Sequence, residues 1–384
     1  MFATRYRRKL DLQQRSGLLR NPPRIDRREG KFVWCETRRL VNFASNDYLG
    51  LGSSATLAGK TAAHFAELGS SASSSRLVSG NYRVIGEAEK AFADYFGYEA
   101  ALFYPSGYQA NVGVLSTLFE SGDTLFFDKR IHASSVKGMA LSGATLSGYN
   151  HNRLAHLDKR LQKSDGRIAV ATESLFSMDG DCLDCAAFGD LKRRFGFFSV
   201  VDEAHAFGVL GSGGRGLARE VADVAVGTMG KALGLFGAFV LLTNQVKQYL
   251  MNFSSPQIYT TSLPAAHAAS AMDALALVAE ADDRRRHLAD LSRWLKSELC
   301  RSGFDVSGDA HILSVHMGLE QLAVDTARRL YQAGLFVLPA RYPTVPLQKA
   351  ILRVSLTSAH DQDDALLLIN TLKANHEKRT QSAN

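Results

Sequence analysis

The stretch FSVVDEAH, residues 198–205, decides the fold class. Its apolar half, Phe198 to Val201, has the length of a buried strand, and Asp202 and His205 follow directly. In open α/β sheets, ligands bind at the carboxyl ends of the parallel strands. The stretch therefore predicts a parallel strand that presents a carboxylate and an imidazole at the ligand-binding edge of a sheet.

Other apolar runs of strand length surround this stretch and alternate with segments of helical spacing. These candidate strands are Ala100 to Tyr104, Thr124 to Phe127, Ile168 to Thr172, Val224 to Val226 and Gly237 to Leu242. The alternation is typical of βαβ units and of a mostly parallel sheet. We expect a large α/β domain over residues 41–285 and a smaller α+β domain over 286–384, with residues 1–40 packing on the smaller one.

The helical spacing of Ala265 to Leu299 predicts one long helix, whose charged middle, residues 280–286, marks the change of domain. The chain has 384 residues, of which 46% are hydrophobic and 22% charged, so a large core is expected. No run approaches the roughly 18 apolar residues of a membrane-spanning helix, and residues 1–20 lack the apolar segment of a secretory signal. These features predict a cytoplasmic protein without a membrane partner.

Three further patterns predict no function of their own. Cys182 and Cys185 form a C-x-x-C without a second Cys or His pair, so we expect no metal site. The net charge of +7 is spread along the chain, which favours a solvated surface or a small polyanionic ligand over nucleic acid. GSGGRG, residues 211–216, matches a dinucleotide fingerprint but does not follow a strand directly, so it predicts a glycine-rich turn.

Two motifs can complete a site with Asp202. GTMGKALG, residues 227–234, surrounds Lys231 with small residues. The segment Ser106-Gly107-Tyr108 follows a candidate strand and opens a helix, whose first backbone N–H groups can bind a phosphate. The sequence thus predicts an amine, an acid and an anion-binding turn near a common point.

Pyridoxal phosphate requires this combination: a lysine for its Schiff base, an acid opposite its pyridine nitrogen and donors for its phosphate. Taken singly, Asp202 could cap a helix, His205 could be an interior histidine and Lys231 could lie at the surface. The ordered combination favours a cofactor site, in which the cationic ring would keep Asp202 ionised.

The sequence resembles the α-oxoamine synthases, which are fold-type I pyridoxal phosphate-dependent transferases with an aspartate aminotransferase-like fold. The resemblance covers nearly the whole chain. Its motifs are NFASNDYLGL (42–51), RLVSG (76–80), SGY (106–108), HAS (132–134), FSMDGD (176–181), DEAH (202–205), GTMGK (227–231), TTSLP (260–264), PTVP (343–346) and LRVS (352–355).

The resemblance implies four catalytic residues, Lys231, Asp202, His205 and His132. Lys231 would form the Schiff base and Asp202 would pair with the pyridinium. His205, with Ser177 nearby, would hydrogen-bond the phenolic oxygen of the ring, and His132 would stack on the ring.

The resemblance also implies how the phosphate and the substrates are held. The phosphate ligands would be Ser106, Gly107, Tyr108, Thr228 and Thr261. Thr261 would come from the second subunit of a homodimer whose active site lies at the subunit interface. Arg353, helped by Asn46, would clamp the amino-acid carboxylate, and Arg20 would contact the distal carboxylate of the acyl chain.

The implied activity is that of an acyltransferase that condenses an amino acid with an acyl thioester and releases CO₂ and the thiol. RYPTVP, residues 341–346, is most similar to the branch that joins L-alanine to pimeloyl-CoA or a pimeloyl carrier protein in biotin biosynthesis. The alternatives are a glycine acetyltransferase, an autoinducer or aminolevulinate synthase, a serine palmitoyltransferase, or a non-catalytic partner subunit. Lys231 argues against the last. The chain departs from the family pattern at Ile85, where a histidine is usual, and at Ala206.

Overall fold

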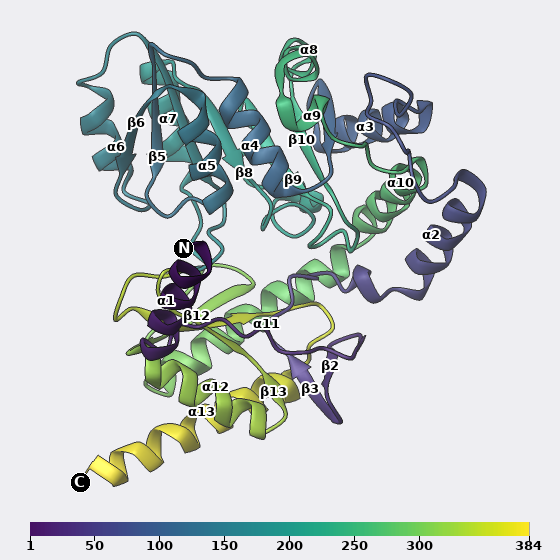
Figure 1. Cartoon of the computed structure of the whole chain (residues 1–384). Coiled ribbons are helices and arrows are strands. Elements are labelled where there is room, and N and C mark those ends of the chain that lie inside the picture. Colours follow the sequence, from purple (N-terminus) through teal and green to yellow (C-terminus); the bar gives the residue numbers. More distant parts are fainter. Residues whose placement is uncertain (384) are drawn as a thin grey trace. The chain divides into compact units, whose positions relative to one another are not determined.

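A computed structural model describes residues 1–383, with side chains through His376, and within this range the chain forms two compact units (Figure 1). The large unit spans Asn46–Ala289. The small unit combines Met1–Ser45 with the chain from Asp290 onward. The domain limits drawn from the sequence stay predictions.

The large unit is built on a sheet with the strand order β4-β10-β9-β8-β7-β5-β6. Its strands are β4 (Ala100–Tyr104), β5 (Asp123–Asp128), β6 (Thr145–Tyr149), β7 (Arg167–Glu173), β8 (Phe198–Asp202), β9 (Val224–Thr228) and β10 (Ala238–Leu242). β10 pairs antiparallel with β4 and β9, whereas the pairs from β9 to β6 are parallel. The predicted α/β class and mostly parallel sheet are confirmed, and each predicted strand of this unit is present.

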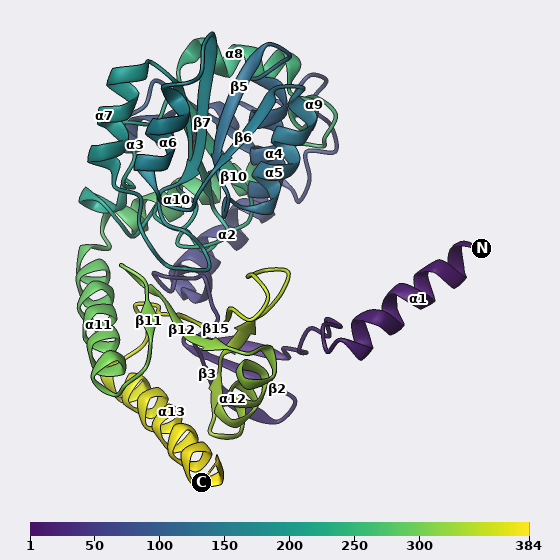
Figure 2. The ribbon, with the colours of Figure 1, turned by 90° about the vertical axis from the view of Figure 1, so that its left-hand side faces the viewer.

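Helices cover both faces of this sheet. They are α2 (Ala55–Leu68), α3 (Arg83–Phe96), α4 (Gly107–Thr117), α5 (Ala133–Ser142), α6 (Leu154–Leu161), α7 (Cys185–Phe195), α8 (Asn244–Phe253), α9 (Ser255–Ile258) and α10 (Ala265–Ala279). Figure 2 shows α4 and α5 on one side of the strands and α6 and α7 on the other. Glycines in the left-handed conformation follow α3, α5 and α7, which is a common way to end a helix.

Alternation along the strands builds a core on each face of the sheet. Leu102 and Val240 point toward α4, where they belong to one buried apolar cluster. Their neighbours Phe103 and Phe239 point the other way and contact Phe92 of α3 edge-on, with ring centroids 5.0 and 4.9 Å away. The two apolar layers hold the strand ends, and therefore the residues that follow them, in fixed positions.

The expected single helix over residues 265–299 is wrong, because the chain breaks after Ala279 and resumes at Asp282 as α11 (Asp282–Arg301). The N–H of Glu280 bonds back to Ala276 and closes α10, which is rich in buried alanines. Asp282 and Asp283 then stand in the first turn of α11, where negative charge favours the start of a helix. The break falls in the charged stretch that the sequence had marked as a change of domain.

The small unit contains two short sheets, β1-β2-β3-β13 and β11-β12-β15-β14. Its further elements are α1 (Phe2–Arg15), β1 (Arg27–Glu29), β2 (Phe32–Cys35), β3 (Arg38–Asn42), β11 (Val306–Ser307), β12 (Ile312–Gly318), α12 (Glu320–Gln332), β13 (Leu335–Phe336), β14 (Leu338–Ala340), β15 (Ala350–Ser355) and α13 (Gln362–Ala383). The first sheet joins the two ends of the chain, since β13 pairs in parallel with β3. Among the helices of the described range, none has the combined length and hydropathy that crossing a membrane requires.

Candidate active site

Two carboxyl side chains stand at the carboxyl ends of neighbouring parallel strands. Glu173 ends β7 and Asp202 ends β8, and the two residues are paired in the strand register. Asp202 is 9% exposed. Its carboxylate accepts hydrogen bonds from the Nδ2 of Asn111 at 2.7 Å and from the backbone N–H of Ala204 at 2.9 Å. The sheet and α4 therefore fix the direction of the Asp202 carboxylate.

A chain of hydrogen bonds leads from Lys231 to the start of the large unit. The Nζ of Lys231 lies 2.9 Å from the Nε2 of His205, and the Nδ1 of His205 lies 2.6 Å from the hydroxyl of Tyr48. The same hydroxyl donates to the Oδ1 of Asn46 at 3.0 Å. Tyr48 and His205 are buried, so their contacts hold the lysine amine near the end of β8.

Small residues around Lys231 are required by close packing. A Cβ atom at Gly234 would lie 2.3 Å from the backbone nitrogen of Gly52, and the φ of Gly234 is +70°. A Cβ at Gly208 would lie 2.7 Å from that of Ala232. The glycines thus let three segments of backbone meet around the lysine.

His132 caps α5 and connects to the same network. Its Nδ1 lies 2.6 Å from the hydroxyl of Ser134, which also accepts a bond from Asn111 at 3.1 Å. The backbone N–H of His132 donates to the Oε1 of Glu173 at 2.6 Å. Asn111 therefore links His132, through Ser134, to Asp202.

The charges of this network shift the pKa values of two members. Desolvation lowers the pKa of His132, although the charge of Asp202 opposes it, and the charge of Lys231 lowers it further. Burial, and then the charge of Asp202, raise the pKa of Glu173 well above its usual value. A raised pKa favours the neutral acid form of Glu173.

The start of α4 and the end of β9 form a second part of the site. Ser106 caps α4, and its Oγ accepts the N–H of Gln109 at 3.3 Å. Thr228 donates to the carbonyl of Gly237 at 3.0 Å and accepts the N–H of Gly230 at 3.1 Å. A Cβ at Gly107 would lie 3.8 Å from the Cβ of Thr228, so the two segments adjoin. The free N–H groups of a helix start and a nearby hydroxyl can bind a phosphate.

The remaining predicted site residues lie apart from this network or on the other unit. Tyr108 is half exposed on the first turn of α4, and the side chain of Thr261 is exposed. Arg353 lies on β15 of the small unit, where its Nη1 donates to the Oγ of Ser355 at 2.7 Å, and Arg20 is exposed on the same unit. The roles of these four residues, like those of the other predicted site residues, stay predictions.

Ser177 lies on a loop that is connected to the turn after β6 by a cluster of three charged side chains, here called the clasp. The clasp consists of His151, Asp128 and Asp181: the Nδ1 of His151 lies 3.0 Å from Asp128, and its Nε2 lies 3.1 Å from Asp181. Asn152 also donates to Asp181 at 2.7 Å. Burial alone would lower the pKa of His151. The hydrogen bonds to both carboxylates outweigh this effect and raise that pKa to about 9.

We expect the clasp to stabilise the fold most at low pH. Because the pKa of His151 is about 9 in the folded chain and about 6.5 when unfolded, its contribution is complete below pH 6.5 and is lost as the pH rises through 9. Because solvent screens the partly exposed ring, we expect the charged His151 to contribute about 1–2 kcal/mol to the free energy of unfolding. Unfolding free energies of wild type and His151→Gln should differ by this amount near pH 6 and converge near pH 10.

The exposed Lys163 of the same unit provides the control for this measurement. Lys163→Gln should leave the unfolding free energy unchanged at both pH values. A His151→Gln effect that stays the same across the range would contradict a charged clasp.

No role was predicted from the sequence for Glu173, Asn111, Ser134 or Tyr48, although Ser134 and Tyr48 stand in the motifs quoted above. Glu173 directly follows an apolar run, as Asp202 does, so the same pattern could have indicated it. The contacts of Ser134 and Tyr48 depend on elements distant in sequence and carry no local signal.

The residues of the large unit fit pyridoxal phosphate. A lysine amine, a buried and fixed carboxylate, a histidine that caps α5 and the serine-capped start of α4 all lie at the carboxyl edge of one sheet. This donor set matches the aldehyde, the ring nitrogen, the ring face and the phosphate of the cofactor. Together with the sheet order, it defines a fold-type I pyridoxal phosphate enzyme.

The chain belongs to the class I and II aminotransferase family, whose sequence signature spans residues 38–372. It is 38% identical to the 8-amino-7-oxononanoate synthase of Chlorobaculum parvum, over 90% of this chain and 93% of that protein. It is also 38% identical to the enzyme of the same name from Pseudomonas entomophila, over 95% and 94% of the two chains.

Solved structures show the same fold. The serine palmitoyltransferase of Sphingomonas wittichii superposes with a TM-score of 0.90 at 28% identity, covering 97% of this chain and 96% of that one. The 8-amino-7-oxononanoate synthase of Francisella tularensis gives a TM-score of 0.78 at 30% identity, covering 89% and 99%. The predicted α-oxoamine synthase resemblance, the fold class, the cofactor pyridoxal phosphate and the class of pyridoxal phosphate-dependent acyltransferase are confirmed.

Proposed function

We propose that the chain condenses L-alanine with a pimeloyl thioester, either pimeloyl-CoA or a pimeloyl carrier protein, and makes 8-amino-7-oxononanoate for biotin. The new bond joins the α-carbon of alanine to the acyl carbon, while the thiol and CO₂ leave and a proton is added. The relatives of that name support this reading. The observation that carries it is the contact between Lys231 and His205 beside the buried Asp202.

When bound, pyridoxal phosphate supplies an electron sink for the negative charge that develops at the α-carbon of the amino acid. Lys231 would hold its aldehyde carbon and Asp202 its ring nitrogen. His132 would lie against the ring, with its orientation fixed by Ser134. The phosphate would lie at the start of α4, near Thr228.

Lys231 is proposed to move the protons. His205 contacts its amine through Nε2, and Tyr48 fixes the His205 ring from the other side. A free lysine amine can take the proton from the α-carbon of alanine and return one to the product. Because the amine is held in one position, the same group can serve both transfers.

Arg353 and Asn46 are proposed to bind the carboxylate of alanine, and Arg20 the distal carboxylate of the pimeloyl chain. A guanidinium binds a carboxylate through two parallel hydrogen bonds, which fixes the orientation of the amino acid. That orientation decides which bond of the α-carbon breaks.

The active form is proposed to be a cytoplasmic homodimer. Several large apolar side chains of the large unit are exposed in the single chain, among them Leu77, Val78, Phe236 and Tyr259. Exposed apolar groups near a site indicate a surface that a second copy covers. Thr261, two residues after Tyr259, would then bind the cofactor phosphate of the partner.

A second candidate function is that of a serine palmitoyltransferase. The TM-score of 0.90 with the Sphingomonas wittichii enzyme favours it. This candidate uses the same cofactor site and differs in the amino acid and in the length of the acyl chain.

A substrate matrix separates the two candidates. Release of free thiol should be measured with alanine, glycine or serine against acetyl, pimeloyl and palmitoyl thioesters, with the amino acid omitted as the blank. We expect kcat/KM for alanine with pimeloyl-CoA to exceed that for glycine by about tenfold or more, since one methyl group in a fitted pocket gives a difference of this size. Preference for serine with palmitoyl-CoA, or for glycine with acetyl-CoA, would contradict the proposal.

A further inference from the structure

Glu89 is a buried charge that the proposed reaction does not use. It lies in the middle of α3 with its side chain 1% exposed. Its Oε1 accepts the backbone N–H of Phe103 on β4 at 2.9 Å, and its Oε2 accepts from the Nζ of Lys247 at 2.8 Å. A buried face of α3 and the edge strand β4 therefore hold the carboxylate in one place.

The third partner of Glu89 comes from a loop. Both terminal nitrogens of Arg76 bond the two oxygens of Glu89, and the Nε of Arg76 donates to Asn81 at 2.9 Å. The Arg76 side chain is only 8% exposed, although its neighbours Leu77 and Val78 are largely exposed. Because a bidentate pair fixes the guanidinium in direction as well as position, Glu89 anchors the loop of residues 70–81.

This loop is joined directly to the segment of residues 260–263. The N–H of Ser262 donates to the carbonyl of Ser74 at 3.0 Å, and the Oγ of Ser262 donates to the carbonyl of Gly80 at 3.0 Å. A Cβ at Gly80 would lie 2.4 Å from the oxygen of Ser74 and 2.8 Å from the Oγ of Ser262. The absence of a side chain at Gly80 thus allows the loop and the segment to meet.

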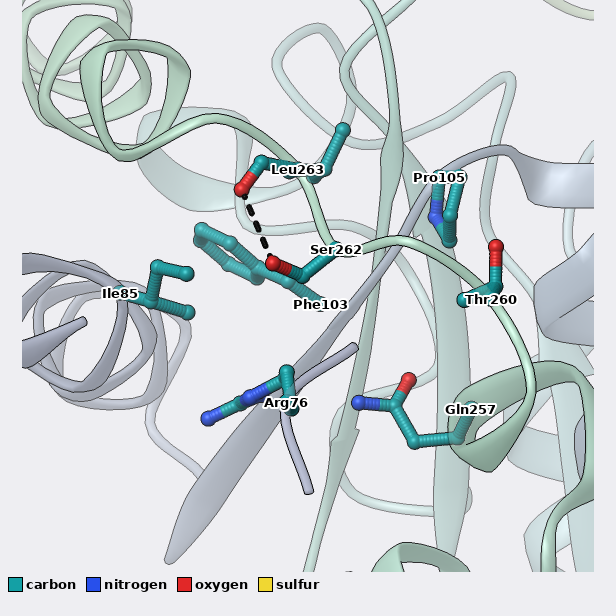
Figure 3. A pocket seen from close by; sticks show the side chains of 8 residues that line it. All are labelled: Arg76, Ile85, Phe103, Pro105, Gln257, Thr260, Ser262 and Leu263. Carbon is teal, nitrogen blue, oxygen red and sulfur yellow. Dashed lines mark hydrogen bonds between the residues drawn. The ribbon is translucent and has the colours of Figure 1, made fainter. Parts of the chain in front are cut away.

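Figure 3 shows the junction from close by. Arg76 of the loop, Gln257 of α9 and Thr260 of the segment line one small pocket, with Phe103 of β4 behind them. Gln257 is buried. The anchor, the loop and the segment therefore share one packed region, and a displacement of Arg76 would be felt at Thr260 and Ser262.

We propose that Glu89 is a positioning residue, which fixes the 260–263 segment through Arg76 and the 70–81 loop and so places Thr261 for the cofactor phosphate of a second copy. The inference rests on the proposed homodimer and on the proposed role of Thr261. Removal of the Glu89 charge leaves the Arg76 guanidinium buried without its counter-ion, which is strongly destabilising and favours displacement of Arg76 toward solvent. The loop and Ser262 then lose their anchor.

The test is a double-mutant cycle on cofactor affinity. Glu89→Gln, Thr261→Ala and the double variant are prepared without cofactor, and the dissociation constant of pyridoxal phosphate is measured by titration. Each single change should weaken binding about tenfold, the typical effect of losing one hydrogen bond to a charged group. The double variant should bind pyridoxal phosphate no more weakly than the weaker-binding single variant, because both changes remove the same contact.

Glu87→Gln supplies the matched control. Glu87 lies two residues earlier on α3. Its replacement with glutamine removes the same charge from a half-exposed side chain, so cofactor affinity should not change. Thermal unfolding and circular dichroism check that each variant folds. If Glu89→Gln does not fold, Ser262→Ala takes its place, since it breaks the bond to Gly80 and leaves the ion pair intact. It should also weaken binding several-fold and non-additively with Thr261→Ala.

The outcomes separate this inference from the proposed function. Tenfold weakening by Thr261→Ala with no effect of Glu89→Gln, or fully additive effects, would overturn the positioning role alone. No effect of Thr261→Ala would overturn the role of Thr261 and the inference with it. Failure of the wild-type chain to bind pyridoxal phosphate would overturn the proposed function itself.

Discussion

Replacement of Lys231 with alanine should lower the rate of product formation by about 10³-fold or more. The amine is proposed both to hold the cofactor and to move the proton of the α-carbon, and loss of a general base alone typically costs 10²–10⁴-fold. No second amine is expected to take over, because His205 and Tyr48 hold this one in place. Thiol release under saturating cofactor and substrates measures the effect.

Two observations make this result specific. Lys137→Ala removes an exposed lysine from α5 and should leave the rate unchanged. Methylamine added to the Lys231→Ala variant should restore part of the activity, because a small amine can enter the space of the missing side chain. Activity of Lys231→Ala close to that of wild type would refute the assigned roles.

Replacement of Asp202 with asparagine should lower kcat by about 10²–10³-fold, the usual cost of removing one fixed electrostatic partner from a site. The amide keeps the size of the side chain but cannot hold a proton on the ring nitrogen by charge. Glu173 does not supply the missing charge, because burial raises its pKa and its Oε1 already accepts the N–H of His132. The rate should be measured with the cofactor in excess, so that weaker binding does not enter.

Asp165→Asn provides the matched control, since it makes the same chemical change at an exposed position. Its kcat should equal that of wild type. If Asp202→Asn retained full kcat, Asp202 would not be the partner of the ring nitrogen.

Most of the large sheet could be predicted because its strands are continuous apolar runs. Phe198 to Val201 and Gly237 to Leu242 match β8 and β10 within one residue. The sequence did not predict β6, because Thr145–Tyr149 lies at the sheet edge, is partly exposed and contains few apolar residues. The strands Phe32–Cys35 and Arg38–Asn42 are short. The second of them pairs with β13, which lies nearly 300 residues away, so no local pattern marks that pairing.

The helix break at residues 280–281 shows a different limit. Ala265 to Ala279 and Asp282 to Arg301 both have helical spacing, so periodicity alone favours one helix. What separates them is burial: α10 is largely buried, whereas the first turn of α11 is charged. Only the packed structure shows that the buried helix α10 ends at Ala279 and that a separate helix begins at Asp282.

The chemistry of the site was readable from the sequence where a reactive side chain follows a strand or opens a helix, as Asp202 and Ser106 do. Ser134 and Glu89 were not assigned, because their importance comes from neighbours that the fold supplies: Asn111 and Arg76. Residue types at strand ends thus indicated the cofactor, while the groups that orient them required the structure.

Borohydride reduction of the protein loaded with pyridoxal phosphate is the most direct check on the proposed cofactor attachment. Reduction makes the bond between the cofactor and its lysine permanent, and mass spectrometry of a digest then identifies the peptide that carries the added mass. We expect the label on Lys231 in wild type and no label on this peptide in Lys231→Ala. A label on another lysine, or an unlabelled wild-type chain, would contradict the account.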